Sequence, residues 1–212
     1  MSTLLKRLDK HFTTCAAAAA GVAAIGTAAN AAIVYTALNH VVPNTFDGTY
    51  LNVETGAFSD VGSSAPAGWD LNPYGTSTTA ISFFQSSTAG TGGATASWVR
   101  LTGAAGPSNL TAGTLIGGAS TFATSGVSYT TGAGAWAANS THILGFRFVD
   151  SGGNIRYGWM RMSVGANFAT RTIIDFAWEN TGGSIEAGAV PGPAGLAALA
   201  MGAVGIRSRR RK

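Results

Sequence analysis

The sequence is poor in the residues that build most catalytic and metal centres. It has one cysteine and three histidines in 212 residues, and only 10% of its residues are charged. The cysteine, Cys15, lies in an apolar N-terminal run, so the rest of the chain has no thiol for a disulfide, a metal site or a nucleophile. His40 and His142 have no second ligand at a suitable spacing. The sequence therefore predicts neither a zinc site nor any other metal or cofactor.

Lysine is absent between residues 11 and 211, and this absence changes the meaning of the net charge. The formal charge of +4 comes from the two ends of the chain: residues 1–31 contribute +2 and residues 207–212 contribute +5, which leaves −3 between them. That central segment has five separate arginines, no basic cluster and no phosphate-binding loop. We therefore predict no nucleic-acid partner.

The first 31 residues are typical of a secretory signal peptide. A basic start is followed by an apolar run from Cys15 to Ile25, which is expected to form the signal helix. Ala29 and Ala31 then supply the small residues of an Ala-x-Ala cleavage site. We predict export through the secretion translocon and cleavage after Ala31.

Residues 189–212 have the three parts of a sorting or anchor segment. Pro191 and Pro193 interrupt regular structure, because proline lacks a backbone donor and restricts the residue before it. Residues 194–206 are apolar on all sides, but as a helix they would rise only about 20 Å, less than a bilayer core of about 30 Å. A basic stop follows, and such residues stay on the cytoplasmic side of a membrane. The stop consists of Arg207, Arg209, Arg210, Arg211 and Lys212.

The motif Pro191-Gly192-Pro193, the apolar run and the terminal arginine cluster together resemble the PEP-CTERM sorting signal of Gram-negative bacteria. The family typically has Glu where this chain has Gly192. The resemblance implies an exosortase-like membrane enzyme as partner, which cuts near the motif. It also implies a C-terminal helix that tethers the chain in the inner membrane before processing, followed by location at the cell surface or outside the cell. Family members share this tail and not a fold, so the resemblance implies no activity.

Residues 32–188 are predicted to form one all-β domain, because the segment is rich in Gly, Ser and Thr and contains all five tryptophans. The clearest pattern is a meander of strands at 142–149, 155–164 and 172–179. Residues 150–154 form a good hairpin turn between the first two strands. A three-stranded meander with one apolar face requires a second sheet to cover it. We therefore predict an antiparallel β-sandwich, jelly-roll-like or lectin-like in outline.

Centring the hairpin on Gly152 predicts its register and its two faces. The register pairs Leu144 with Met160, Gly145 with Trp159 and Arg147 with Tyr157. One face is expected to be core, and it consists of Leu144, Phe146, Phe148, Met160, Met162 and Val164. The third strand is expected to add Ile174, Phe176 and Trp178 to one side. The opposite face consists of Arg147, Tyr157, Trp159 and Arg161.

The main functional hypothesis is an exported protein of the cell envelope or extracellular matrix, without a catalytic site. An alternative is a carbohydrate-binding module that acts on extracellular polysaccharide, because exposed aromatic rings stack on sugars. The outward face with Arg147, Tyr157 and Trp159 is the candidate platform. Further aromatic candidates are Trp69, Tyr74, Trp98 and Trp136.

A second alternative is a glycoside hydrolase-like enzyme, which needs two carboxyl groups about 5 to 9 Å apart. Asp175 and Glu179 project from one face of a single strand, but their Cα atoms would lie roughly 13 Å apart. An ion pair between Asp175 and either Arg161 or Arg156 is the preferred interpretation. Residues 150–154 offer oxygen ligands for calcium without the calcium-loop pattern, so a plain hairpin turn is preferred there as well.

Overall fold

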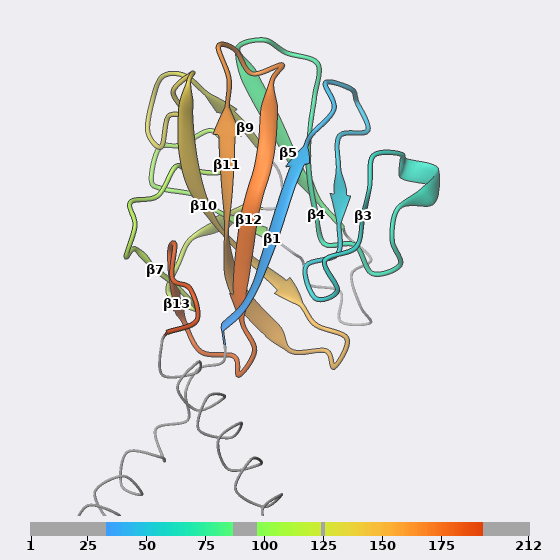
Figure 1. Ribbon diagram of the computed structural model, residues 1–212. Helices are drawn as coiled ribbons and strands as arrows, with labels where there is room; N and C mark the ends of the chain where they lie inside the picture. The colour runs from blue at the N-terminus through green and yellow to red at the C-terminus, as the bar shows by residue number, and fades with distance from the viewer. Residues whose placement is uncertain (1–32, 87–96, 124–125, 193–212) are drawn as a thin grey trace, which may run out of the picture. The chain divides into compact units, whose positions relative to one another are not determined.

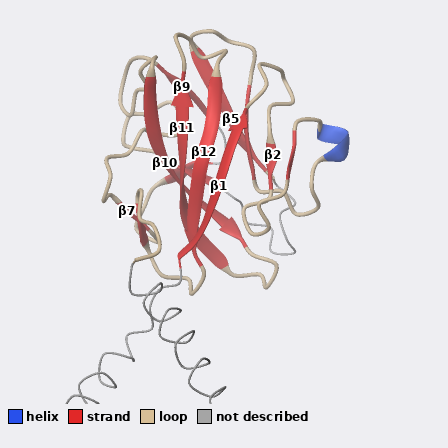
Figure 2. Cartoon of the chain, viewed as in Figure 1, coloured by secondary structure: helices blue, strands red, loops and turns tan. Residues whose placement is uncertain are grey.

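The computed structural model describes residues 33–86, 97–123 and 126–192 (Figure 1). These ranges form β-strands, loops and one short 3-10 helix, η1 (Gly62–Ser64), and contain no α-helix (Figure 2). The all-β prediction is therefore confirmed. The two expected terminal helices lie outside the described ranges. Within those ranges, no helix is long and apolar enough to cross a membrane.

Most of the strands belong to two antiparallel sheets. The six-stranded sheet has, in spatial order, β1 (Ile33–Val41), β12 (Arg171–Glu179), β11 (Ile155–Val164), β10 (Ser140–Val149), β6 (Ser97–Val99) and β8 (Phe122–Ala123). The five-stranded sheet has β3 (Phe58–Ser59), β2 (Tyr50–Leu51), β4 (Leu71–Tyr74), β5 (Ala80–Gln85) and β9 (Gly126–Tyr129). A small pair is formed by β13 (Ile185–Glu186) and β7 (Leu115–Ile116).

The β10–β11 hairpin has the predicted register: Leu144 pairs with Met160, and Arg147 pairs with Tyr157. The turn follows from its residue types. The Asp150 carboxylate accepts a 2.7 Å hydrogen bond from the Asn154 amide, and Gly153 adopts φ = 79°, a value that favours glycine. The hairpin interpretation of residues 150–154 is thus confirmed.

The prediction for the third strand is wrong at one residue. Arg161 pairs with Asp175, but Met162 pairs with Ile173, so Ile174 is an extra residue in β12. Such a β-bulge reverses the alternation of side chains on either side of it. Ile173 is consequently buried completely, whereas Ile174 is only half-buried. Phe176 and Trp178 lie in the core as predicted.

The main core lies between the two sheets, because one continuous cluster of buried side chains draws on both. Members from the six-stranded sheet include Trp98, Leu144, Phe146, Phe148, Met160, Met162, Val164 and Phe176. Members from the five-stranded sheet include Leu51, Leu71, Ile81 and Phe83. The predicted second sheet therefore exists, and it covers the predicted apolar face of the hairpin.

A second, smaller core covers the opposite face of the six-stranded sheet. Its buried members are Val99, Leu110, Ile116, Trp159, Ala177, Ile185 and Ala187. Ile33, from the start of β1, and Ala189, after β13, both pack against this cluster. The two ends of the described domain therefore meet on the same face of one sheet, at the same end of it (Figure 1).

Candidate functional site

The predicted sorting motif starts two residues after Ala189, the last residue held by the folded domain. The Ala189 amide donates to the Glu186 carbonyl at 3.0 Å, and the Ala189 carbonyl accepts from Trp159 Nε1 at 2.8 Å. Pro191 and Gly192 are exposed. Pro193, the apolar run, the basic stop and the expected cleavage residues Ala29 and Ala31 lie outside the described residues, so their roles stay predictions.

The expected aromatic platform on the outer face of the hairpin is covered. Trp159 is only 1% exposed, because residues 110–123 and the segment around β13 pack over it. Tyr157 is half-buried and stacks on Phe122, with ring centroids 6.1 Å apart. Arg147 lies over the same Phe122 ring at 4.5 Å. The expectation that these three residues form an open surface is therefore wrong, since Trp159 has no ring face left for a ligand.

Trp98 and Trp136, two other candidates for sugar stacking, are buried completely in the main core. Trp69 is different, since it is half-buried and belongs to a partly open aromatic cluster. Its ring centroid lies 4.9 Å from that of Tyr50 and 6.2 Å from that of Phe84, which is 43% exposed. Leu51 and Phe83 face the core, so their strand neighbours Tyr50 and Phe84 face away from it.

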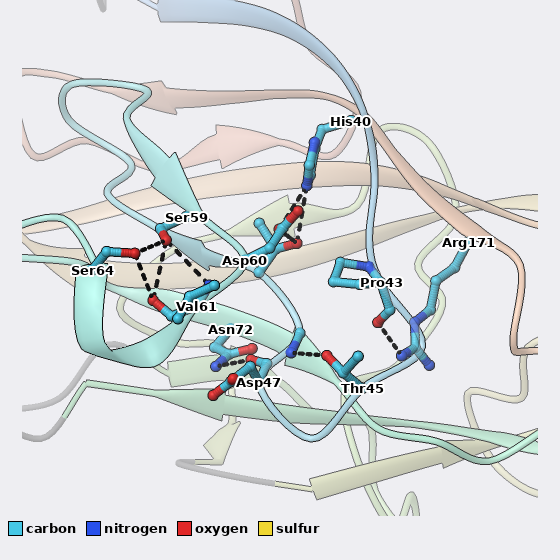
Figure 3. A network of polar contacts seen from close by, with 12 residues as sticks. His40, Pro43, Thr45, Asp47, Ser59, Asp60, Val61, Ser64, Asn72 and Arg171 are labelled. Atoms are coloured by element: carbon cyan, nitrogen blue, oxygen red, sulfur yellow. Dashed lines mark hydrogen bonds and ion pairs between the residues drawn. The ribbon is translucent and has the colours of Figure 1, made fainter.

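The two histidines within the described ranges, His40 and His142, have structural partners. His40 Nε2 lies 2.9 Å from Asp60 Oδ1 and 3.2 Å from Thr49 Oγ1, as Figure 3 shows in part. A hydroxyl nucleophile is activated when one ring nitrogen faces the hydroxyl and the other faces the carboxylate. Here one nitrogen meets both, and Thr49 is buried completely. His142 is buried beside Trp136, and this burial lowers its pKa. In the part of the chain that the structure describes, no three His, Asp or Glu side chains form a metal-binding group.

The carboxylates of β12 are engaged in structural contacts. Asp175 accepts a 2.9 Å hydrogen bond from Arg161 Nε, so the predicted ion pair is confirmed with Arg161 as the partner. Tyr35 donates to the same carboxylate at 2.8 Å. Glu179 is buried completely and accepts from the Thr181 and Gly183 amides, which closes the turn after β12. Neither carboxylate has the surroundings of a hydrolytic residue.

A cavity of about 310 Å³ contains three carboxylates that the sequence did not indicate as a group. It lies between the turn after β2 and the turn between β10 and β11. Its lining consists of Asn52, Glu54, Thr55, Ala67, Gly68, Asp70, Val149, Asp150 and Ser151. Val149, the last residue of β10, therefore meets residues of three loops at this place.

Asp70 is the unusual group in the cavity, because its side chain is only 2% exposed. Oδ2 accepts a 2.8 Å hydrogen bond from the Val53 amide, and no described residue donates to Oδ1. Burial raises the pKa of Asp70 to about 7, and the nearby charge of Glu54 adds to this effect, while the Val53 hydrogen bond opposes it. Buried groups with strongly shifted pKa values in a cavity are typical of functional sites.

The other two carboxylates hold the walls of the cavity together. Glu54 accepts hydrogen bonds from the Ser151 amide and from Ser151 Oγ, both at 2.8 Å. Asp150 forms an ion pair with Arg156 at 2.7 Å. Burial raises the pKa of Asp150, but the hydrogen bonds from Asn154 and the pairing with Arg156 together outweigh burial and hold this pKa below its usual value. The Glu54–Ser151 contact ties the loop after β2 to the β10–β11 hairpin. Two of the three loops that line the cavity are therefore held together by this contact.

A larger hollow of about 380 Å³ lies beside β6 and β7. Its lining includes the exposed side chains of Leu101 and Leu115, with Arg100 as the one charged residue, and it has no carboxylate or histidine. Because recognition and chemistry need convergent polar groups, the smaller cavity around Asp70 is the better candidate site.

Sequence reasoning missed Asp70 and Glu54. The usable signal was local: Asp70 stands between Trp69 and Leu71, and a single acid flanked by large apolar residues is unusual at an exposed position. Glu54 gave no such signal, because its partner Ser151 is 97 residues away along the chain.

No protein-family model, no curated protein and no solved structure matches this chain. We therefore infer the function from the residues and contacts of the described domain.

Proposed function

We propose that this protein is exported and displayed at the cell surface or in the extracellular matrix as a non-catalytic β-domain, after an exosortase-like membrane enzyme has acted at Pro191–Pro193. The observation that supports this proposal is the position of the motif. The fold holds the chain as far as Ala189, and Val190, Pro191 and Gly192 are exposed immediately afterwards. A membrane-bound enzyme that cuts a substrate requires such an accessible segment next to the folded part.

The experiment is to change Pro191 and Pro193 together to alanine and to follow the mature protein in cell fractions of the native host by mass spectrometry. We expect the variant to keep its tail and to remain with the inner membrane. Pro66→Ala, in the loop after η1, is the matched control and should be processed as the wild type is. An unchanged mature mass and location for the double variant would contradict the proposal. Deletion of residues 207–212 tests the role of the basic stop separately.

A second candidate function is carbohydrate binding, with a jelly-roll-like or lectin-like domain as the finer description of the fold. The observation that favours it is the partly open cluster of Tyr50, Trp69 and Phe84 on the five-stranded sheet. A glycan array with the exported protein tests this function. Binding that Trp69→Ala abolishes, and that Trp159→Phe leaves intact, would support it, since Trp159 is covered.

The cavity around Asp70 supports binding more than glycoside hydrolysis. A hydrolase needs a second carboxyl group that is free to act on the substrate or on a water molecule. Glu54 already accepts two hydrogen bonds from Ser151, and Asp150 is paired with Arg156. We therefore propose no catalytic role for this cavity.

A further inference from the structure

Asp70 differs from the other buried acids because it has no partner that offsets its charge. Asp150 pairs with Arg156, Asp175 pairs with Arg161, and Glu179 accepts from several donors of the turn that follows it. Asp70 receives one backbone hydrogen bond, and no cation among the described residues contacts it. A buried carboxylate without a counter-charge is costly to the fold. Asp70 carries this free-energy cost and also lines a cavity. This combination suggests that a ligand in the cavity supplies the missing positive charge.

The shape of the cavity limits the kind of ligand. Its volume of about 310 Å³ is at the lower end of the range for small-molecule sites, enough for one sugar ring or one long side chain. Val149, Ala67 and Gly68 give it aliphatic walls, and these suit an apolar stem.

Its charge limits the ligand further. Asp70, Glu54 and Asp150 all line the cavity, and Arg156, the partner of Asp150, is the cation in contact with this group. This surplus of carboxylates disfavours anions. A bare metal ion is also disfavoured, because the three carboxylates do not converge into a metal-binding group among the described residues. An ammonium group on a stem has three donors and needs no such convergence, so it fits the arrangement better.

We propose that this cavity binds a primary ammonium group carried on a short stem, as in an amino sugar or a lysine side chain, with Asp70 Oδ1 as its counter-ion. The stem lies against Val149 and Ala67, and the ammonium group points toward Asp70. Glu54 and Asp150 add to the negative potential, and their contacts with Ser151 and Arg156 keep the two turns in place. The site does not depend on the sorting tail.

The test is isothermal titration calorimetry on the full-length purified protein at about pH 7, where about half of Asp70 is ionised and the amino groups of the charged probes are mostly protonated. The probes form charged and neutral pairs: n-butylamine against n-butanol, and glucosamine against N-acetylglucosamine. Nα-acetyl-lysine methylamide represents the lysine side chain. We expect the charged member of each pair to bind about tenfold more tightly or better. Tighter binding of glucosamine than of the lysine derivative identifies an amino sugar as the ligand, and the reverse order identifies a lysine side chain. Equal binding within both pairs overturns the proposal.

Two variants and one control locate the site. Asp70→Asn should abolish the preference for the charged probe. Ala67→Leu keeps Asp70 but places a larger side chain in the cavity, and it should weaken the binding of all probes about tenfold. Ala67 is exposed, so this second variant keeps the test valid if Asp70→Asn does not fold. Glu186→Gln removes one exposed carboxylate outside the cavity and should bind as the wild type does. Wild-type binding by both Asp70→Asn and Ala67→Leu contradicts the proposal.

A pH series gives a readout that a purely structural role for Asp70 would not change. The charged groups that face Asp70 are Glu54 and, on the hairpin, Asp150 with Arg156. n-Butylamine stays charged over the whole series, so loss of its binding below about pH 7 reports protonation of the site. We expect about a tenfold loss between about pH 8 and about pH 5.5. Affinity that does not change with pH overturns the role of Asp70 as counter-ion.

Discussion

Arg171 holds three separate segments of the fold together through hydrogen bonds of its side chain. It is buried completely, and its guanidinium donates to the carbonyls of Phe168, Gly75 and Pro43, the last of which is visible in Figure 3. Burial lowers its pKa to about 10, so it remains charged at neutral pH. One side chain from the start of β12 thus fixes the loop after β1, the end of β4 and the loop before β12.

Arg171→Met should therefore lower the free energy of unfolding by about 3 to 5 kcal/mol, because the buried carbonyls of Phe168 and Gly75 and the partly buried carbonyl of Pro43 lose their donor. Urea denaturation followed by circular dichroism measures this change. Arg100→Met, at an exposed position, is the matched control and should change stability by less than about 0.5 kcal/mol. Similar midpoints for both variants would show that Arg171 does not hold these loops.

Asp70 makes stability depend on pH, and the sign is set by its raised pKa. The pKa rises from its ordinary 3.8 to about 7, so between these values the folded state holds a proton that the unfolded state lacks. The free energy of unfolding should therefore fall as pH rises from about 4 to about 7, by a few kcal/mol at most, and then level off.

Urea midpoints of the wild type and Asp70→Asn across this range measure the effect. The comparison with the variant is necessary because burial lowers the pKa of His142, whose contribution changes in the opposite direction. The contribution of Asp150 lies below this range, because its pKa is lowered. Equal pH slopes in the wild type and the variant would refute the role of Asp70.

At the residue scale, the sequence predicted a contact between two neighbouring strands better than it predicted the burial of individual side chains. The Arg161–Asp175 ion pair could be anticipated because both residues lie on neighbouring strands of one recognisable meander. The burial of Asp70 could not, because the loops that enclose it come from distant parts of the chain. The burial of Trp159 was missed for the same reason, since its cover is formed by residues 110–123 and the segment around β13.

At the element scale, strand β11 depends on the glycine that precedes Trp159. A Cβ atom built on Gly158 would lie 2.4 Å from the Phe146 ring and 2.6 Å from the Ala177 carbonyl oxygen. Phe146 is buried completely and the carbonyl belongs to the backbone of β12, so neither can move easily. The glycine allows the two neighbouring strands to approach while a phenylalanine ring crosses beneath them.

We expect Gly158→Ala to lower the free energy of unfolding by about 2 to 3 kcal/mol through overpacking. Thermal denaturation followed by circular dichroism measures the change. Gly118→Ala is the control, because its added Cβ would meet only Tyr157 Oη at 3.5 Å, an ordinary contact. A melting temperature of Gly158→Ala equal to that of the control would mean that the strands can separate without cost.

The elements that the sequence predicted well are the long ones. Strands β10 and β11 have ten residues each, enough for alternation and turn chemistry to specify both register and faces. Strands of two residues, such as β7 and β13, are too short to show an alternation of apolar and polar side chains. The bulge at Ile174 could not be predicted from the sequence either. Ile173 and Ile174 are both apolar, so either residue fits the alternation expected of a strand with one buried face.

At the scale of the whole molecule, the domain has a core on each face of the six-stranded sheet. The sequence predicted the core between the sheets, because the apolar face of the hairpin requires a cover. The second core depends on the chain returning after β12 to place β13 beside β7, and no local pattern specifies that pairing. The consequence concerns the end of the domain: residues up to Ala189 belong to the fold, although they adjoin the proposed sorting motif.

This arrangement predicts where the chain can be cut without loss of the fold. A chain that ends at Gly192 keeps every contact of Ile185, Ala187 and Ala189, and should melt as the full-length protein does. A chain that ends at Ser184 lacks β13, loses two buried apolar side chains and leaves Trp159 Nε1 without its acceptor. We expect it to be about 3 kcal/mol less stable.

Urea denaturation measures the stability difference, and acrylamide quenching of tryptophan fluorescence reports the exposure of Trp159. Trp159→Phe in the shortened chain is the control, because the added quenching should disappear when this one ring is replaced. Equal stability and equal quenching of the two truncated chains would show that β13 is not part of the domain. The expected difference would instead require any processing enzyme to cut after Ala189, which agrees with the exposure of Val190, Pro191 and Gly192.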